Sequence, residues 1–189
     1  QEDVPRFVGH IRSEAQRLVT LIGDIIRLSQ LDEGEPMPTE TVDLLEVTRE
    51  AAENLQTAAA ARDVTVTVEG QPAELEGVRR LLYEIVYNLC DNAIRYNRPG
   101  GHVELSCGTN ADGCPYFCVE DNGIGIPQDS QSRVFERFYR VDKSRSKATG
   151  GTGLGLAIVK HIAVLHGARI DLESTVGTGT TIRIIFPKM

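Results

Sequence analysis

The sequence predicts an α+β fold, in which a mixed or antiparallel sheet is covered by helices on one face. Three segments of helical character, at 43–61, 77–97 and 153–167, are interleaved with short segments of strand character. One of the latter, "VTVTVE" at 64–69, alternates apolar and polar residues as a half-buried strand does. With 189 residues and 41% hydrophobic content, the chain can form one ordinary domain, or a compact domain with an appendage.

Residues 4–31 predict one long helix of the type found in bundles. Pro5 suits the first turn, and apolar positions then recur at alternating spacings of three and four, the a/d pattern of a coiled coil. The seam is Val8, Ile11, Ala15, Leu18, Ile22, Ile25 and Ser29. No second segment of the chain has a matching pattern, so we expect a homodimer formed through residues 4–31. The alternative is that this helix folds back on its own domain.

The segment 31–40, "LDEGEPMPTE", is rich in Gly and Pro and predicts a linker at 34–40. A short strand is expected around 39–42, and Asp43 suits the N-cap of the helix that runs to about Ala61. The helix at 77–97 ends before Pro99 and Gly100. Three segments are therefore expected: a bundle-type helix at 1–33, the linker, and a larger domain at 41–189.

The remaining elements are a hairpin, a polar segment, a helix and two strands. "HVELSCG" and "PYFCVED" flank the turn "TNADG". Residues 127–150 are polar apart from a short amphipathic run, "RVFERFY". The helix at 153–167 opens with glycines and closes at Gly167. "ARIDLES" and "GTTIRIIFP" are strands separated by a turn at Gly177.

Composition excludes several classes of function. A net charge of −7 disfavours nucleic acid as a partner. The basic residues between Arg133 and Lys147 indicate either a small anionic ligand or a solvated loop. The spacings of the four cysteines match no zinc pattern. We expect free thiols that pack as small apolar side chains, in a reducing, cytoplasmic setting. The alternative is that Cys107 and Cys118 face each other across the hairpin. No apolar run approaches the roughly 18 residues of a membrane span.

A glycine-rich turn opens the last helix. "TGGTGLGL" at 149–156 presents closely spaced glycines and a helix N-terminus, both of which can approach phosphate oxygens. A Walker loop would need a lysine that is missing here, and a Rossmann turn would need a different glycine spacing after a strand. The candidate phosphate-binding residues are Gly151, Thr152, Gly153, Leu154 and Gly155.

A second glycine turn, "DNGIGIP" at 121–127, follows a strand. Asp121 can accept a hydrogen bond from an exocyclic amine, as an adenine-binding residue does, and Gly123 and Gly125 allow a base to approach the backbone. Asp-Asn-Gly is also a good turn sequence in its own right, so both interpretations stand at this point.

The helix at 77–97 carries polar residues on one face. Glu84, Asn88 and Asn92 are spaced i, i+4 and i+8. Two amides on an otherwise apolar helix are costly unless they are satisfied. Amide oxygens are ligands that Mg²⁺ accepts together with phosphates and water, and Arg95 can reach a phosphate. The alternative for either asparagine alone is a structural hydrogen bond.

Taken in order, five segments resemble the conserved boxes of sensor histidine kinases. "NLCDNAIRYN", "DNGIGIP", "FERFYRVD", "GGTGLGL" and "GTGTTIRIIFP" are similar to the N, G1, F and G2 boxes and the terminal strand of their ATP-binding domain, a member of the GHKL superfamily with gyrase B, Hsp90 and MutL. The resemblance covers residues 38–189. It implies the Bergerat α/β sandwich and an ATP lid at about 127–152.

The resemblance also implies residue roles. Asp121 would bind the adenine amine, Asn88 and Asn92 would hold Mg²⁺ and the phosphates, and Tyr96 would lie against the nucleotide. Arg95 stands where the family often has Lys. Arg137 and Arg140 of the F box are further candidates for phosphate contacts.

The resemblance favours phosphoryl transfer over ATP hydrolysis. The ATP-hydrolysing relatives carry a glutamate four residues before the metal-binding asparagine, and Asn88 occupies that place here; a neutral amide is no general base. The expected reaction is transfer of the ATP γ-phosphate to a histidine, for relay to a response regulator. The alternatives are a GHKL serine kinase of the anti-sigma type and an ATP-gated interaction module.

The N-terminal helix is similar to the second helix of the kinases' dimerisation and phosphotransfer domain. The first helix, which carries the acceptor histidine in the family, is absent from the sequence given. None of the four histidines, His10, His102, His161 and His166, is followed by the acid and proline of the acceptor box. We therefore expect that the chain does not phosphorylate itself and that His10 is no acceptor. The resemblance also implies that the parent is a membrane sensor with this part in the cytoplasm.

Overall fold

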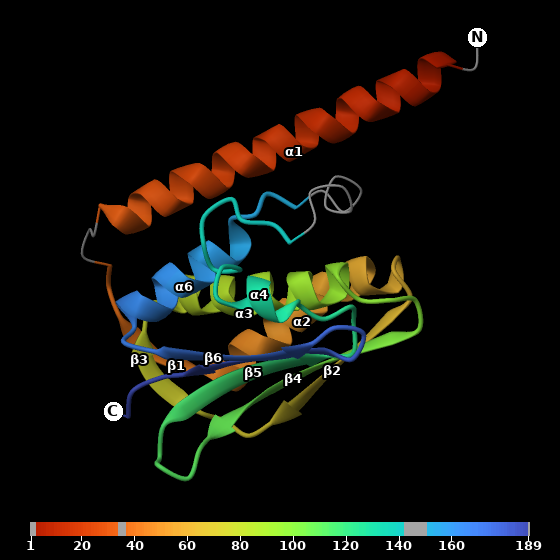
Figure 1. Ribbon diagram of the computed structural model, residues 1–189. Helices are drawn as coiled ribbons and strands as arrows, with labels where there is room; N and C mark the ends of the chain where they lie inside the picture. Colours follow the sequence, from red (N-terminus) through yellow and green to blue (C-terminus); the bar gives the residue numbers. More distant parts are fainter. Residues whose placement is uncertain (1–2, 34–36, 142–150, 189) are drawn as a thin grey trace.

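The computed structural model describes residues 3–33, 37–141 and 151–188, without the side chains of 3–6, 10, 13 and 17. Helices and strands are interspersed along the chain (Figure 1). Their bounds are α1 Asp3–Asp32, β1 Glu40–Asp43, α2 Leu44–Ala60, β2 Val64–Gly70, β3 Glu74–Gly77, α3 Arg79–Arg95, β4 Gly101–Thr109, β5 Pro115–Asp121, α4 Gln128–Gln131, α6 Gly155–Leu165, β6 Arg169–Thr175 and β7 Gly179–Ile185.

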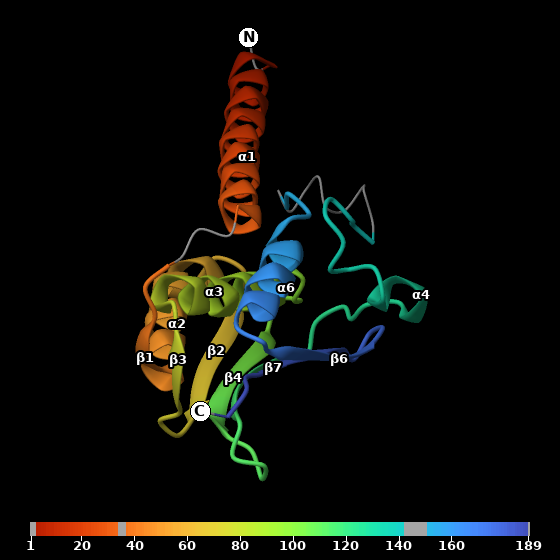
Figure 2. The same cartoon turned by 90° about the vertical axis from the view of Figure 1, so that its left-hand side faces the viewer.

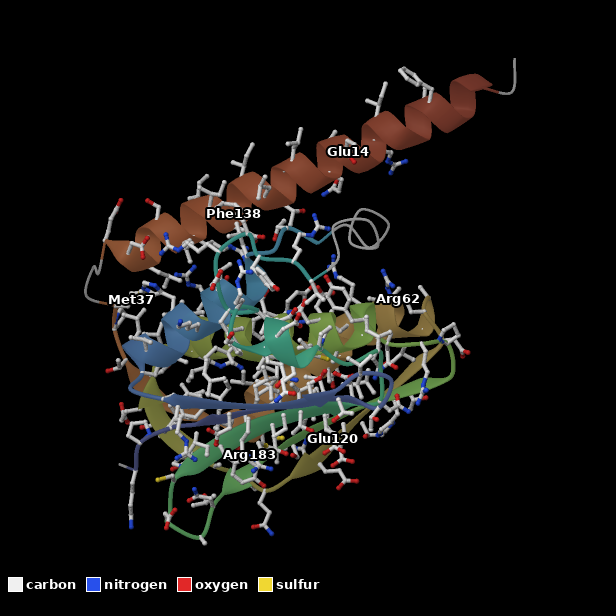
Figure 3. All side chains as sticks on the ribbon, viewed as in Figure 1. Glu14, Met37, Arg62, Glu120, Phe138 and Arg183 are labelled. Atoms are coloured by element: carbon white, nitrogen blue, oxygen red, sulfur yellow. The ribbon has the colours of Figure 1, made fainter. Side chains whose placement is uncertain are left out.

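The architecture is a two-layer sandwich, as the sequence predicts. Five strands form a mixed sheet in the order β2-β4-β5-β7-β6, in which only β2 and β4 run parallel. Helices α2, α3 and α6 cover one face, and the other face is open (Figures 1 and 2). The core lies between the layers, with Phe117, Leu105 and Ile184 of the sheet against Leu82 and Ile158 of the helices. Exposed polar residues such as Glu120 and Arg183 lie on the open face (Figure 3).

The strand β3 is absent from the sequence-based prediction. Its sequence, "ELEG", has low strand propensity, but it pairs with β1 in a small antiparallel sheet that places Leu75 opposite Val42. Both side chains are buried. Tertiary pairing therefore decides the conformation here, and local propensity does not.

The helix α2 begins where its cap predicts. The Asp43 carboxylate accepts hydrogen bonds from the backbone N–H of Leu45 at 2.9 Å and from that of Ala73 at 3.1 Å. One side chain thus satisfies an N–H of the first helical turn and also holds the segment before β3 against the helix.

The four cysteines are free, and three of them are buried. The suggestion that Cys107 and Cys118 face each other is wrong, because the register places Cys107 opposite Phe117 and Cys118 opposite Ser106. The two thiols consequently point to opposite faces of the sheet. Burial raises the pKa of the Cys90 thiol to about 12, which keeps it protonated and unreactive.

The helix α1 extends well beyond the sandwich and contacts it through its C-terminal turns (Figures 1 and 2). Leu28 and Leu31 are buried against the rest of the molecule, and α1 lies over α6. Towards the N-terminus the predicted seam is exposed, as at Leu18 and Ile22. The C-terminal end of the helix packs on its own domain, as the alternative predicts, whereas the homodimer through residues 4–31 stays a prediction. Among the described residues, no helix has the length and apolar character needed to cross a membrane.

Candidate functional site

The polar face of α3 forms the floor of the site. The Asn88 side-chain N–H donates to the backbone carbonyl of Glu84 at 2.8 Å, so its oxygen points away from the helix. That oxygen lies beside the start of α6: a Cβ placed on Gly155 would be 2.9 Å from Asn88 Oδ1 and 3.8 Å from Asn92 Nδ2. The structure thus brings both asparagines together with the glycine turn.

The glycine turn closes over the end of α3. A Cβ on Gly151 would lie 3.4 Å from the Tyr96 hydroxyl and 4.0 Å from the Arg95 guanidinium. Gly153 has φ +77°, a conformation that favours glycine. Helix α6 follows directly, its N-cap Leu154 is fully buried, and no side chain caps it. The first-turn N–H groups of α6 are therefore available to an anionic ligand at this end of the pocket.

Arg140 lies on the other side of the turn. A Cβ on Gly153 would be 3.2 Å from its Cγ atom. Within the part of the chain that the structure describes, its Nε and Nη2 atoms are buried and have no hydrogen-bond partner. Burial of guanidinium N–H groups without acceptors is costly. The arrangement therefore fits a bound anion next to the glycine turn.

Asp121 ends β5 at the base of the second glycine turn. Its Oδ1 atom accepts from the backbone N–H of Gly123 at 2.8 Å. Burial raises the pKa of the Asp121 carboxyl, although the N–H groups of Gly123 and Thr180 act in the opposite direction. The turn also touches the end of α3, because the Ile124 N–H donates to the Tyr96 carbonyl at 3.1 Å. Asp121 is thus a half-buried acceptor held by the backbone next to Tyr96.

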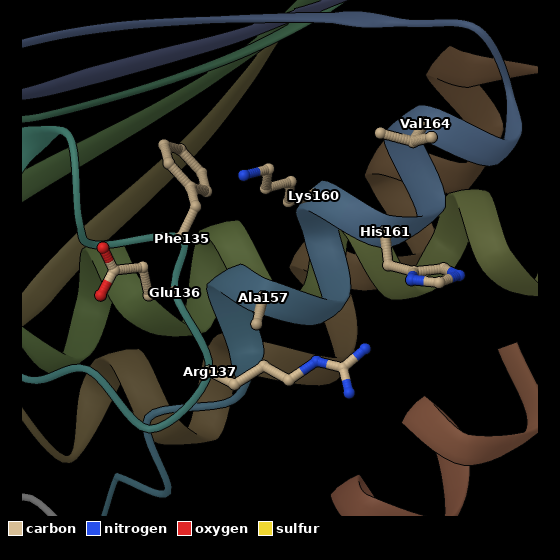
Figure 4. A pocket seen from close by; sticks show the side chains of 7 residues that line it. All are labelled: Phe135, Glu136, Arg137, Ala157, Lys160, His161 and Val164. Carbon is tan, nitrogen blue, oxygen red and sulfur yellow. The ribbon is translucent and has the colours of Figure 1, made fainter. Parts of the chain in front are cut away.

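Arg137 is not brought to this group. Its guanidinium binds both carboxylate oxygens of Asp32 on α1, each at 2.9 Å. Arg137 also lines a pocket of about 370 Å³ between the F-box segment and the outer side of α6 (Figure 4). The other lining residues are Phe135, Glu136, Ala157, Lys160, His161 and Val164, and none of the asparagines or Asp121 is among them.

The contacts of α1 with the site are not signalled by the sequence. Asp24 accepts a hydrogen bond from the Thr152 hydroxyl at 2.7 Å, and Arg27 pairs with the buried Glu84 at 3.2 Å. These residues occupy ordinary helix-surface positions, and only the docking of α1 gives them partners. The lid expected at 127–152 lies partly outside the described residues, which stop at 141 and resume at 151.

The sandwich, the oxygen-bearing face of α3 and the two glycine turns define a nucleotide-binding domain of the GHKL class. The model of the histidine kinase-, DNA gyrase B-, and HSP90-like ATPase family matches residues 77–189. The chain belongs to this family, and it corresponds to the ATP-binding catalytic part of sensor histidine kinases.

Similar proteins agree with this assignment. The sensor-like histidine kinase SenX3 of Mycolicibacterium smegmatis is 41% identical over 189 residues, which are 99% of this chain and 49% of that protein. The phosphate regulon sensor protein PhoR of Pseudomonas aeruginosa is 34% identical, over 96% of this chain and 41% of its own. The chain thus spans about half the length of the curated relatives it matches.

Solved structures give the same fold. The mycobacterial sensor histidine kinase MprB superposes with a TM-score of 0.70 at 31% identity, covering 79% of this chain and 97% of that one. Full-length ShkA in complex with AMPPNP has a TM-score of 0.80 at 24% identity, over 98% of this chain and 39% of that chain, which supports the fold including the long helix. These comparisons give no support for an anti-sigma serine kinase.

Proposed function

We propose that this chain binds Mg²⁺–ATP and donates the γ-phosphate to a histidine on a separate helix of the parent kinase, from which the phosphate passes to a response regulator. The observation that carries the proposal is the convergence of the glycine turn on Asn88 and Asn92, next to the unpaired guanidinium atoms of Arg140. The relatives are named sensor histidine kinases, and ShkA was solved in complex with AMPPNP.

The donor set suits magnesium. Because the Asn88 N–H is used by the helix, its carbonyl oxygen is available to a cation. Mg²⁺ is commonly held by a few protein oxygens together with phosphates and water. No cluster of three or more His, Cys, Asp or Glu exists in the described part of the chain that would hold a metal alone. Asn88 and Asn92 would therefore hold the ion only with the triphosphate, and it would neutralise phosphate charge there.

The remaining candidates bind and orient ATP. Asp121 would accept a hydrogen bond from the adenine amine, and Tyr96 would lie against the nucleotide. Gly123 and Gly125 would serve base binding through the turn itself, since their missing side chains let it fit against the Tyr96 carbonyl and β6. At the phosphate end we assign contacts to Arg95, Arg140, Gly151, Thr152, Gly153, Leu154 and Gly155. With an amide at position 88 and no general base assigned to water, positioning and charge neutralisation would favour transfer over hydrolysis. Arg137 would join the phosphates only after release from Asp32.

Nucleotide binding is the first test. Titration calorimetry of the chain with Mg²⁺–ATP should give saturable binding, and Asp121→Asn should weaken it by about tenfold or more, since a carboxylate acceptor is lost. Glu120→Gln, on the open face next to it, is the matched control and should bind like the wild type. Unchanged affinity in Asp121→Asn would show that the adenine site is elsewhere.

Transfer is the second test. A separate acceptor helix pair bearing the acid-and-proline histidine box, incubated with this chain and γ-labelled ATP, should acquire label that is lost in acid, as phosphohistidine is. The chain alone should stay unlabelled at His10, whose side chain lies outside the described residues. ATP binding without any transfer would support the interaction-module alternative.

Three further features of the parent belong to the proposal. Residues 1–33 would form part of its dimerisation helices, residues 34–40 a linker, and 41–189 the catalytic domain. The parent would dimerise through residues 4–31 and would be a membrane sensor with this part in the cytoplasm. The exposed seam of α1 and the names of the relatives support these assignments.

A further inference from the structure

A partly buried hydroxyl on β6 lies at the centre of a hydrogen-bond network behind the second glycine turn. Ser174 Oγ accepts from the backbone N–H of Ile126 at 2.8 Å, donates to the Gly179 carbonyl at 3.0 Å, and lies 2.8 Å from the Thr180 hydroxyl. A hydroxyl has one donor and two acceptor positions. All three are used here if Thr180 donates to Ser174.

The network reaches the start of the lid. Gln131 is the last residue of α4, and its side-chain nitrogen lies 3.0 Å from the Ile126 carbonyl and 2.9 Å from the Ser174 carbonyl. Both partners are acceptors, so only the N–H₂ end of the amide can face them. One side chain therefore ties the first turn after the glycine loop to strand β6.

The network also reaches the adenine side of the pocket. Thr180 stands opposite Asp121 in the ladder between β5 and β7, and its N–H favours the ionised Asp121 carboxyl. The glycine turn fits closely against β6, because a Cβ on Gly125 would lie 2.1 Å from the Thr175 carbonyl. A shift of the Ser174 hydroxyl would therefore displace Ile126 and Thr180, and through them the Asp121 carboxylate.

We propose that Ser174 is a positioning residue for base recognition: its hydroxyl, with the Gln131 amide, fixes the 121–126 turn so that the Asp121 carboxylate faces the adenine amine, and sets the start of the lid against β6. The inference rests on the proposed nucleotide site. It adds residues that touch neither base nor phosphate and act only through the turn.

The test compares two nucleotides in matched variants. ATP carries an amine that would donate a hydrogen bond to Asp121, and inosine triphosphate carries a carbonyl in its place. The ratio of the two affinities therefore measures base recognition alone. The wild-type chain should prefer ATP. Ser174→Val should lower the affinity for ATP by about tenfold and should change the affinity for inosine triphosphate by less than about twofold. Ser174→Thr, which has the shape of valine but keeps the hydroxyl, should restore the preference.

Two more variants keep the outcome decisive. Gln131→Met, of similar length without polar atoms, should lower the preference in the same direction and should stand in if Ser174→Val does not fold. Ser132→Ala, an exposed hydroxyl next to Gln131, should change nothing. An unchanged ratio in Ser174→Val, or an equal loss for both nucleotides, would overturn the positioning role. A wild type that binds ATP without preferring it to inosine triphosphate would overturn the Asp121 assignment, and the inference with it.

Discussion

At the scale of single residues, Asp121 shows how a binding group can be held at a cost to stability. Burial raises its carboxyl pKa above the ordinary value of 3.8 despite two backbone donors. A carboxyl whose pKa is higher in the folded state destabilises the fold when it is ionised, at a pH above that value, and the penalty is relieved by protonation. The ionised carboxyl is nevertheless the better partner for an amine, because both of its oxygens are acceptors, whereas the protonated form carries an O–H donor.

The pH dependence of ATP binding should follow from this pKa. As the pH falls, Asp121 takes up its proton before an ordinary aspartate does, so ATP affinity should decline while other carboxylates remain ionised. Calorimetric titrations across the acidic range measure the decline. Asp121→Asn should lack that step and should melt at the same or a higher temperature than the wild type. A fall in its melting temperature would mean that the ionised carboxylate stabilises the fold.

The imidazole of His166 connects two helices through hydrogen bonds to backbone groups. Its Nδ1 atom donates to the Ile162 carbonyl at 2.9 Å, and its Nε2 atom accepts from the Val78 N–H at 3.2 Å, which links the end of α6 to the start of α3. His166→Phe leaves a half-buried N–H without an acceptor and should lower the free energy of unfolding by about 1–3 kcal/mol in urea titrations. His102→Phe, on the open face, should cost less than about 1 kcal/mol. Equal effects would show that the link is unimportant.

At the scale of elements, the docking of α1 sets a buried contact against a surface ion pair. Leu28 is only 5% exposed, whereas the side chains of Arg137 and Asp32 are 50% and 43% exposed. Exposed pairs contribute about 0–1 kcal/mol, and removal of a buried leucine side chain costs about 2–5 kcal/mol. The apolar contact should therefore dominate.

Hydrogen exchange of the peptide that covers residues 20–33 measures this docking. Leu28→Ala should accelerate exchange there strongly, and Asp32→Asn only slightly. Leu18→Ala, at a position that is 55% exposed on the same helix, is the control and should have no effect on docking. If Asp32→Asn released the helix as fully as Leu28→Ala, the charged contact would be the principal one.

The same scale shows what the sequence could predict. Helices with a clear cap or periodicity, such as α2 behind Asp43, begin where expected, because local chemistry decides them. The i, i+4 spacing likewise places Asn88 and Asn92 on one face, and the structure brings both to the glycine turn. Strand β3 and the partner of Arg137 depend on contacts between distant segments, so no local pattern could reveal them.

At the scale of the whole molecule, the helix α1 leaves a large apolar surface without cover. Side chains from Phe7 to Ile26 along this helix are 45–68% exposed at the positions Phe7, Val8, Ile11, Leu18, Val19, Ile22, Ile25 and Ile26. Soluble monomers rarely expose so continuous an apolar strip. The heptad spacing of the strip suits packing against other helices, and a second copy supplies an identical strip.

Self-association should therefore be concentration-dependent and should depend on this strip. In sedimentation experiments the 20.7 kDa chain should approach twice that mass as its concentration rises. Ile22→Glu places a charge in the middle of the seam, where desolvation would be costly, and should keep the chain monomeric without changing its melting temperature. Val176→Glu alters a side chain that is 63% exposed in the β6–β7 turn and should leave the association intact. A wild type that stays monomeric would contradict self-association through the strip, and dimers that survive Ile22→Glu would show that another surface forms the dimer.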